Sequence, residues 1–251
     1  MQTFQVKKEN IRDDFISVSA EICHHLTKVL RIQKGENLCF SDGENYYRGS
    51  VDEFGKDEVI VKIDCVSPIE DEPGLSVTLI QGLPRGDKMD QILQKATELG
   101  VTAVIPVESD HSQVHLKENK RADKRNRWQK IAAAAAEQCG RGVVPSVSLP
   151  CSLKAALASL DDHTALILCY ERETETGFKT VTAELKNHFK KIALFIGPEG
   201  GFSEKEVKII IEAGGKAVTM GRRILRTETA GPAALAVLMY EFGEWEVNYG
   251  D

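Results

Sequence analysis

Two segments of the sequence bring together residue types that can hold a ligand and stabilise charge. Residues 194–202 read LFIGPEGGF, with three glycines around Pro198. Glycines adopt backbone conformations closed to other residues and let a ligand approach the main chain. Residues 220–230 read MGRRILRTETA and hold three arginines and an acid. Guanidinium groups in such a loop can stabilise an anion.

The glycine segment on its own is best interpreted as a plain turn. GPEGG is not the GxGxxG of dinucleotide-binding proteins, and it lacks the lysine and the Ser/Thr of a P-loop. These missing residues argue against an enzyme that acts on nucleotide phosphates.

The arginine segment carries an apolar pair among its charges. Ile224 and Leu225 lie between Arg223 and Arg226, and we expect this pair to be buried. The arginines would then lie at the edge of the core, where Arg usually pairs with an anion. The alternative is an ordinary solvated surface.

The elements that must position both segments follow from the periodicity of the second part of the chain. Strand patterns alternate there with helix patterns, which predicts an α/β fold with a mostly parallel sheet covered by helices on both faces. Ligands bind such sheets beyond the carboxyl ends of the strands, where both segments lie. We expect strands at 75–83, 101–107, 165–170, 192–196 and 217–220, and helices at 87–99, 126–139, 203–214 and 229–242.

Two helix ends have recognisable signals. Ser203 to Glu206 form a capping box that opens one helix, and Gly214 ends it. Thr227 or Thr229 is expected to cap the last helix.

The first 70 residues have a different pattern, rich in short strands. We expect a helix at 24–31 and strands at 38–40, 46–51 and 59–66, separated by glycine turns. Short strands joined by tight turns suggest a small barrel. The acidic segment 68–74, PIEDEPG, is the best linker, so we expect two domains, 1–72 and 73–251.

Composition excludes some classes of protein. A net charge of -6 argues against a protein coated in positive charge, although it permits a local basic patch. No apolar run approaches the length of a membrane span, and the first ten residues hold no apolar signal-peptide core. We therefore expect a cytoplasmic protein without membrane contact.

Cysteine and histidine spacing indicates no metal site. The six cysteines are scattered and form no CxxC pair, so we expect reduced thiols, mostly in the core. His24 and His25 are adjacent on a predicted helix and would point apart. The cysteines are Cys23, Cys39, Cys65, Cys139, Cys151 and Cys169.

Basic side chains are dense between residues 117 and 130. This run is either a solvated helix face or a surface that contacts RNA phosphates, and both interpretations have equal weight. Lys28 and Arg31 form a second candidate patch. The run comprises Lys117, Lys120, Arg121, Lys124, Arg125, Arg127 and Lys130.

Taken together, five segments resemble the SPOUT-class methyltransferases, and specifically the 16S ribosomal RNA uridine-N3 methyltransferases. IGPEGGFSEKEV and MGRRILRTETA are similar to that family's two characteristic loops. Three further segments match the family in the same order and at the same spacing: HHLTKVLR, GLPRGDKMDQILQKATELGV and RWQKIAAAAAEQCGR. The resemblance therefore covers nearly the whole chain.

The resemblance implies a fold and partners that periodicity does not predict. It implies an N-terminal PUA-like β-barrel that binds RNA, and a C-terminal domain with a deep trefoil knot. The family is homodimeric, binds S-adenosylmethionine in the knot, and acts on 16S ribosomal RNA in the small ribosomal subunit. The last helix is also more apolar than one buried face needs, through Leu235, Val237, Leu238, Tyr240, Phe242 and Trp245.

The resemblance also implies a set of site residues. Cofactor contacts are expected from Ile196, Gly197, Pro198, Glu199, Gly200, Gly201, Met220, Gly221, Ile224, Leu225, Thr229 and Ala230. RNA contacts are expected from Lys28, Arg31, Arg85, Lys88 and Arg141.

The chemistry of the expected reaction suggests catalytic residues. Uridine N3 is a poor nucleophile until its proton leaves, so a guanidinium that faces the uracil oxygens would stabilise the developing charge. Arg226 is the first candidate and Arg223 the second. Glu199 or Glu228 can accept the proton or orient an arginine, and we favour orientation for both.

Two positions depart from the family pattern. An arginine-aromatic pair is usual near residue 3, where this chain has Gln2 and Thr3 before Phe4. His111 stands before Ser112, where an arginine is usual. Both changes remove positive charge expected to face RNA. Two other functions stay open: a related methyltransferase for another RNA or base atom, and an RNA-binding assembly factor without catalysis. The intact loops oppose the second.

Overall fold

The computed structural model describes residues 2–114 and 116–246, and it forms two compact units. The N-terminal unit comprises the chain up to Glu72 together with residues 136–144. The C-terminal unit comprises residues 73–135 and the chain from Pro145 onward. The break between Glu72 and Pro73 lies in the acidic segment 68–74, and residues 136–144 pack with the N-terminal unit although they lie beyond that segment in sequence.

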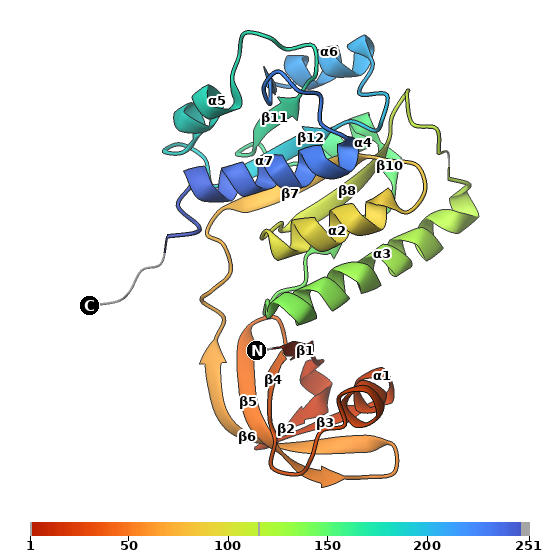
Figure 1. Ribbon diagram of the computed structural model, residues 1–251, viewed down its shortest axis with the longest axis vertical. Helices are drawn as coiled ribbons and strands as arrows, with labels where there is room; N and C mark the ends of the chain where they lie inside the picture. Colours follow the sequence, from red (N-terminus) through yellow and green to blue (C-terminus); the bar gives the residue numbers. More distant parts are fainter. Residues whose placement is uncertain (1, 115, 247–251) are drawn as a thin grey trace. The chain divides into compact units, whose positions relative to one another are not determined.

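The N-terminal unit is built on a curled sheet of six strands, a half-barrel with β1 and β2 at its edges (Figure 1). Its order is β1-β4-β5-β6-β3-β2, and the β1–β4 pair alone is parallel. The strands are β1 (Thr3–Gln5), β2 (Ile11–Arg12), β3 (Phe15–Ser19), β4 (Asn37–Ser41), β5 (Asn45–Phe54) and β6 (Glu58–Pro68). The three predicted strands are confirmed as β4, β5 and β6. β1 and β2 escaped prediction because they are three and two residues long, and β3 was also missed although it is as long as β4.

The helix predicted at 24–31 is longer and less regular than expected. It starts as α1 (Ala20–His24) and continues as a π-helical turn, η2 (His25–Leu30). Arg31 ends it in the left-handed region, with φ 55°. Leu26 is fully buried in the core of the curled sheet. A 3-10 turn, η1 (Lys8–Asn10), precedes β2.

The C-terminal unit is built on a parallel sheet, which confirms the predicted α/β architecture. Its order is β10-β8-β7-β12-β11-β13, with β9 paired to β8. All of these pairs are parallel. The strands are β7 (Ser76–Gly82), β8 (Ala103–Glu108), β9 (Ser146–Val147), β10 (Cys151–Ser152), β11 (Ala165–Cys169), β12 (Lys191–Ile196) and β13 (Lys216–Val218).

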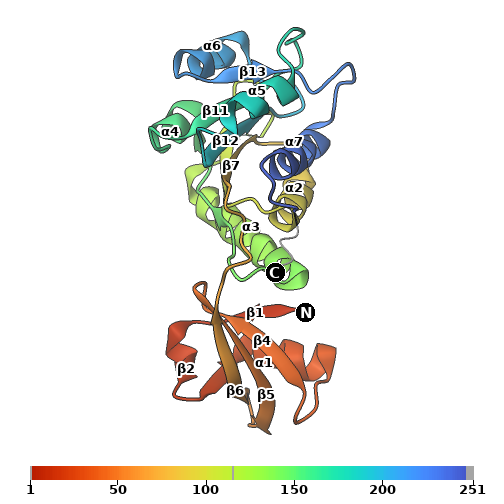
Figure 2. The same cartoon turned by 90° about the vertical axis from the view of Figure 1, so that its left-hand side faces the viewer.

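Helices cover both faces of this sheet (Figure 2). On one face α2 (Lys88–Glu98) packs against α7 (Thr227–Glu241), which lies on β7 and β12 and also contacts α5 (Phe178–Leu185). On the other face α4 (Leu153–Ala158) contacts β8 and α6 (Glu204–Glu212) contacts β11. That second layer shares a core that includes Ile80, Phe195 and Ile210. The capping box at Ser203 is confirmed, since both of its reciprocal hydrogen bonds are present.

The long helix α3 (Glu118–Cys139) starts eight residues before the predicted position 126. Its first half is therefore the charged run, and part of that run is not a solvated face. Arg121 forms an ion pair with Glu108 at 2.9 Å, and Arg125 donates from Nε to the carbonyl of Val147 at 3.0 Å. These arginines attach the helix to the C-terminal unit.

Three features of composition have structural outcomes. The six cysteines are free, but the prediction that most lie in the core is wrong: Cys39 is buried, Cys65 and Cys139 are exposed, and the other three are partly exposed. In the described ranges, no His, Cys, Asp and Glu side chains gather into a group that could hold a metal ion. None of the helices described has both the length and the apolar character that crossing a membrane requires.

Candidate active site

A cavity of about 570 Å³ lies in the C-terminal unit at the carboxyl ends of three neighbouring strands, β12, β11 and β13. Its walls are residues 196–201 after β12, 169–171 after β11 and 219–227 after β13, with Lys88 from α2 and Ala230 from α7. Parallel strands bring their carboxyl ends to one edge of the sheet, so segments far apart in sequence form a single site.

The predicted site residues gather at this cavity. Of the expected cofactor contacts, every one lines it except Thr229, and the catalytic candidates Arg226, Arg223 and Glu199 also line it. Thr229 is exposed, and its backbone amide donates to the carbonyl of Arg226 at 2.8 Å in the first turn of α7.

Sequence reasoning missed the wall contributed by β11. Cys169, Tyr170 and Glu171 line the cavity, as do Thr219 and Thr227. Cys169, Tyr170 and Thr219 lie within predicted strands and Glu171 directly follows one, and these positions near strand ends were the only signal for them. Thr227 was predicted only as a possible helix cap. Burial raises the pKa of the Cys169 thiol to about 12. This group is therefore a neutral thiol and not a nucleophile.

The loop after β12, which we call the glycine loop (residues 197–201), needs glycine for two measurable reasons. A Cβ on Gly197 would lie 2.8 Å from Cα of Gly201. Gly201 has φ +69°, and a Cβ there would lie 2.6 Å from Oε1 of Glu171. A turn in which the amide of Gly201 donates to the carbonyl of Pro198 at 2.9 Å closes the loop. The chain thus turns back tightly beside the cavity.

Thr227 connects the glycine loop to the start of α7. Its hydroxyl donates to the carbonyl of Gly197 at 2.7 Å and accepts from Nε2 of Gln81 at 2.9 Å. Thr227 is buried, with 5% of its surface exposed. The prediction that Thr227 or Thr229 caps α7 is wrong: Arg226 is the N-cap residue, without a side-chain cap, and the Thr227 hydroxyl serves the loop instead.

The segment after β13, which we call the arginine loop (residues 221–226), is more exposed than predicted. Ile224 has 82% of its surface exposed, so the expectation that the Ile224-Leu225 pair is buried is wrong for Ile224. The physical reason is that this loop borders the cavity and does not pack on the core. The Arg226 side chain is 83% exposed, with Nη1 4.0 Å from Oε1 of Glu228.

A chain of alternating charges crosses the cavity wall. Nζ of Lys88 lies 2.8 Å from Oε1 of Glu199 and 3.5 Å from Oε2 of Glu228. The backbone amide of Arg85 also donates to Glu199 at 3.1 Å. Burial by itself would raise the pKa of Glu199, but the hydrogen bonds from Lys88 and from backbone amides outweigh it and hold that pKa below its usual value. The same bond to Glu199 raises the pKa of Lys88.

One departure from the family pattern contacts the glycine loop directly. Nδ1 of His111 lies 2.9 Å from the carbonyl oxygen of Gly200. A Cβ on Gly200 would lie 3.0 Å from Cβ of His111. The imidazole therefore packs where the loop has no side chain of its own.

The RNA-contact candidates are divided between the units. Arg85 and Lys88 lie in the C-terminal unit, while Lys28 and Arg31 are exposed in the N-terminal unit. Arg141 is only 12% exposed, because Glu72 accepts hydrogen bonds from its Nε at 3.1 Å and its Nη2 at 2.5 Å.

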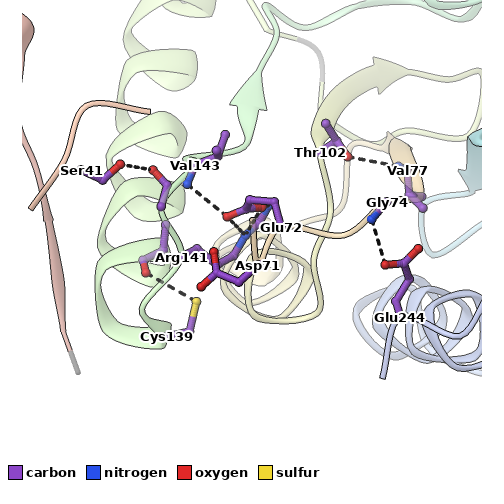
Figure 3. A network of polar contacts seen from close by, with 12 residues as sticks. Ser41, Asp71, Glu72, Gly74, Val77, Thr102, Cys139, Arg141, Val143 and Glu244 are labelled. Carbon is purple, nitrogen blue, oxygen red and sulfur yellow. Dashed lines mark hydrogen bonds and ion pairs between the residues drawn. The ribbon is translucent and has the colours of Figure 1, made fainter. Parts of the chain in front are cut away.

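The Glu72 carboxylate also organises the chain after α3. It accepts from the backbone amide of Val143 at 3.1 Å, and Ser41 donates to the carbonyl of Gly142 at 2.6 Å (Figure 3). Arg141 and its neighbours thus fasten residues 136–144 to the N-terminal unit.

Comparison with known proteins agrees with this geometry. Residues 71–239 match the RNA methyltransferase domain, and residues 18–64 match the RNA methyltransferase PUA domain. The chain is 35% identical over 231 residues to ribosomal RNA small subunit methyltransferase E of Bacillus subtilis, with 90% of each chain covered.

Solved structures are similar over the same extent. The small subunit methyltransferase E of Neisseria gonorrhoeae, bound to S-adenosyl methionine, is 33% identical with a TM-score of 0.84, and 96% of this chain and 97% of that chain are covered. A methyltransferase of Legionella pneumophila in complex with the same cofactor is 31% identical with a TM-score of 0.84, and 95% and 96% are covered. With both domain matches, the parallel sheet and the cavity at its strand ends, the chain belongs to the RNA methyltransferase family that includes the ribosomal RNA small subunit methyltransferases E.

Proposed function

We propose that this protein transfers a methyl group from S-adenosylmethionine to N3 of a uridine in the 16S ribosomal RNA of the small ribosomal subunit. The observation that carries the proposal is the cavity of about 570 Å³, where the glycine loop and the arginine loop of an RNA methyltransferase domain meet. A substrate within the ribosome would place the enzyme in the cytoplasm.

The residues of the cavity fit an adenosyl cofactor. Its volume lies within the range of about 300–1,000 Å³ usual for small-molecule sites. Gly197 and Gly201 leave the main chain open, while Ile196, Pro198 and Leu225 give apolar walls. S-adenosylmethionine bound there supplies an electrophilic methyl group on a sulfonium. We assign its binding to the cavity-lining members of the expected set and leave out Thr229, which lies outside the cavity.

Arg226 is our candidate for the group that stabilises the uracil as it loses its N3 proton. Its guanidinium is exposed at the cavity and would face the uracil oxygens, where negative charge develops. Arg223 is the second candidate. Glu199 is a poor proton acceptor because its pKa is lowered and its carboxylate is held by Lys88. Glu228 lies close enough to Arg226 to orient it.

The knot and the dimer belong to this proposal. Thr227 at the start of α7 donates to the carbonyl of Gly197 in the glycine loop, and the family resemblance implies that the chain threads a trefoil knot in this region. Val237, Tyr240 and Trp245 stay 39%, 69% and 53% exposed on and just after α7, and a second copy of the chain would cover them.

The N-terminal domain, residues 1–72, would contact RNA through Lys28 and Arg31.

The test is methyl transfer to small ribosomal subunits that lack the modification. Subunits are incubated with the protein and labelled S-adenosylmethionine, and the RNA is digested to nucleosides. The expected product is N3-methyluridine. A different methylated nucleoside would point to another base atom, and label in transfer RNA alone would point to another RNA. RNA binding without any label would favour a non-catalytic assembly factor.

A further inference from the structure

We propose that Lys88 is a positioning residue that acts through Glu228 to keep Arg226 directed at the substrate. This assignment rests on the proposed function and replaces the expectation that Lys88 contacts RNA.

Lys88 joins three elements at the cavity. It starts α2, while Glu199 belongs to the glycine loop and Glu228 to the first turn of α7. Its ammonium lies between the two carboxylates, at 2.8 Å from Glu199 and 3.5 Å from Glu228. The Lys88 side chain is 30% exposed, so most of it is enclosed by these partners. An ammonium used in this way has little capacity left for a phosphate.

Glu228 depends on Lys88 for its charge balance. Its side chain is 15% exposed, and its Oε2 atom is enclosed by protein with no hydrogen bond within the part of the chain that the structure describes. The 3.5 Å contact with Lys88 is an ion pair that is too long for a good hydrogen bond. A half-buried carboxylate that loses its cation must find another one.

The cation that remains within reach of Glu228 is Arg226. Among the described residues, these two form an ion pair at 4.0 Å, and the Arg226 side chain is 83% exposed and has room to move. Without Lys88, the carboxylate would draw the guanidinium towards itself and away from the uracil. With Lys88 present, Glu228 is shared between two cations, and Arg226 keeps its charge available at the cavity.

The experiment compares Lys88→Met with Lys88→Arg in steady-state methylation of small subunits. We expect Lys88→Met to lower kcat by roughly 100-fold, a loss that a misplacement of about 1 Å can cause. KM for the subunits and the calorimetric affinity for S-adenosylmethionine should stay near the wild-type values. Lys88→Arg should restore most of kcat, because a guanidinium can also bridge two carboxylates.

Two further variants make the result specific. Lys95→Met removes the same charge from an exposed position of the same helix, and it should leave kcat unchanged. Glu228→Gln removes the carboxylate through which Lys88 acts. Adding Lys88→Met to Glu228→Gln should therefore cost little further activity, whereas independent effects would multiply. This double variant also keeps the test available if Lys88→Met alone is too unstable to assay.

Several outcomes would overturn the inference. A raised KM with unchanged kcat would make Lys88 an RNA contact after all. If Lys88→Met lowers both thermal stability and cofactor affinity, and Lys88→Arg restores neither, the role of Lys88 is structural. If the losses of kcat from the two substitutions multiply in the double variant, Lys88 does not act through Glu228. If the wild-type protein transfers no methyl group, the proposed function itself is refuted. The wild-type assay alone distinguishes that outcome from a failure of the inference about Lys88.

Discussion

At the scale of single residues, the proposed chemistry depends on Arg226. Its guanidinium is exposed at the cavity and has one ion-pair partner among the described residues, Glu228 at 4.0 Å. We expect Arg226→Ala to lower turnover by about 100- to 1,000-fold, the typical cost of losing one charge-stabilising donor. Cofactor affinity should change little. Arg226→Lys should rescue poorly, because an ammonium lacks the planar fork that spans two acceptors.

The measurement is methyl incorporation beside calorimetric cofactor affinity, with Arg172→Ala, an exposed arginine outside the cavity lining, as a control that should keep both values. Near-normal turnover of Arg226→Ala would shift the assignment to Arg223. A collapse of cofactor binding would mean that Arg226 supports the cavity and not the reaction.

Gly201 is a second residue whose type is decided by geometry. Its φ of +69° and the Glu171 oxygen 2.6 Å from an added Cβ both oppose a side chain. We expect Gly201→Ala to weaken S-adenosylmethionine binding and to lower the unfolding free energy by about 1 kcal/mol through backbone strain. Gly214→Ala is the matched control, since its φ is +91° but nothing lies within 4 Å of the added Cβ.

In that control, stability should fall by a similar amount while calorimetric cofactor affinity stays unchanged. Equal affinities of the Gly201 and Gly214 variants would show that the glycine loop does not bind the cofactor.

Glu199 gives the molecule a pH-dependent contact. Its pKa is lower in the folded chain than in the unfolded one, so its contribution to stability is present above the unfolded pKa near 4.5. That contribution is lost as the pH falls through the folded pKa. We expect the wild type to lose more stability than Glu199→Gln between pH 5 and the folded pKa, in urea unfolding at each pH. If the unfolding free energies of both proteins depend on pH in the same way, the ion pair between Glu199 and Lys88 does not contribute to stability.

At the scale of elements, Thr227 links α7 to the glycine loop. Thr227→Val keeps the shape but leaves the Gly197 carbonyl and the Gln81 amide without this partner. We expect a loss of about 1–3 kcal/mol in the free energy of unfolding, the usual cost of unpaired buried polar groups. Thr229→Val changes the same residue type in the same turn at an exposed position. In urea titrations the unfolding free energy of Thr229→Val should stay near that of the wild type. If both variants lose the same stability, the Thr227 hydrogen bonds do not stabilise the fold.

Most elements of the C-terminal unit were predictable because apolar periodicity and end signals agree. Gly100 and Gly214 stop their helices with φ +91°, as the sequence indicates. The start of α3 was missed because its first half is charged and its arginines pair with the unit itself. The two-residue strands β9 and β10 are too short for a period.

Sequence motifs predicted where the candidate site lies, and the errors in that prediction have physical causes. Ile224 is apolar yet exposed, because hydropathy cannot distinguish a loop that lines a cavity from one that packs on the core. The ion pairs of Lys88 were not predicted because its carboxylate partners lie 111 and about 140 residues away in sequence, and its contact with RNA stays a prediction. The insertion of β12 between β7 and β11 is likewise a long-range pairing that local patterns do not encode.

At the scale of the whole molecule, the exposed apolar side chains near the C-terminus predict association of two copies. Tyr240 and Trp245 are 69% and 53% exposed, and Val237 lies one turn before Tyr240 on α7. Burying a large apolar side chain contributes about 1.5–3 kcal/mol. We therefore expect a homodimer in sedimentation at micromolar concentration, and Tyr240→Glu should shift it towards monomer.

Ile211→Glu is the control for this shift, because Ile211 is 43% exposed on α6, which covers the opposite face of the sheet. That variant should sediment as the wild type does. If the cavity is completed by the second copy, Tyr240→Glu should also lower methyl transfer in proportion to the dimer lost, with recovery at higher protein concentration. A wild-type monomer at micromolar concentration would refute the dimer, and a fully active monomeric variant would show that each chain carries a complete site.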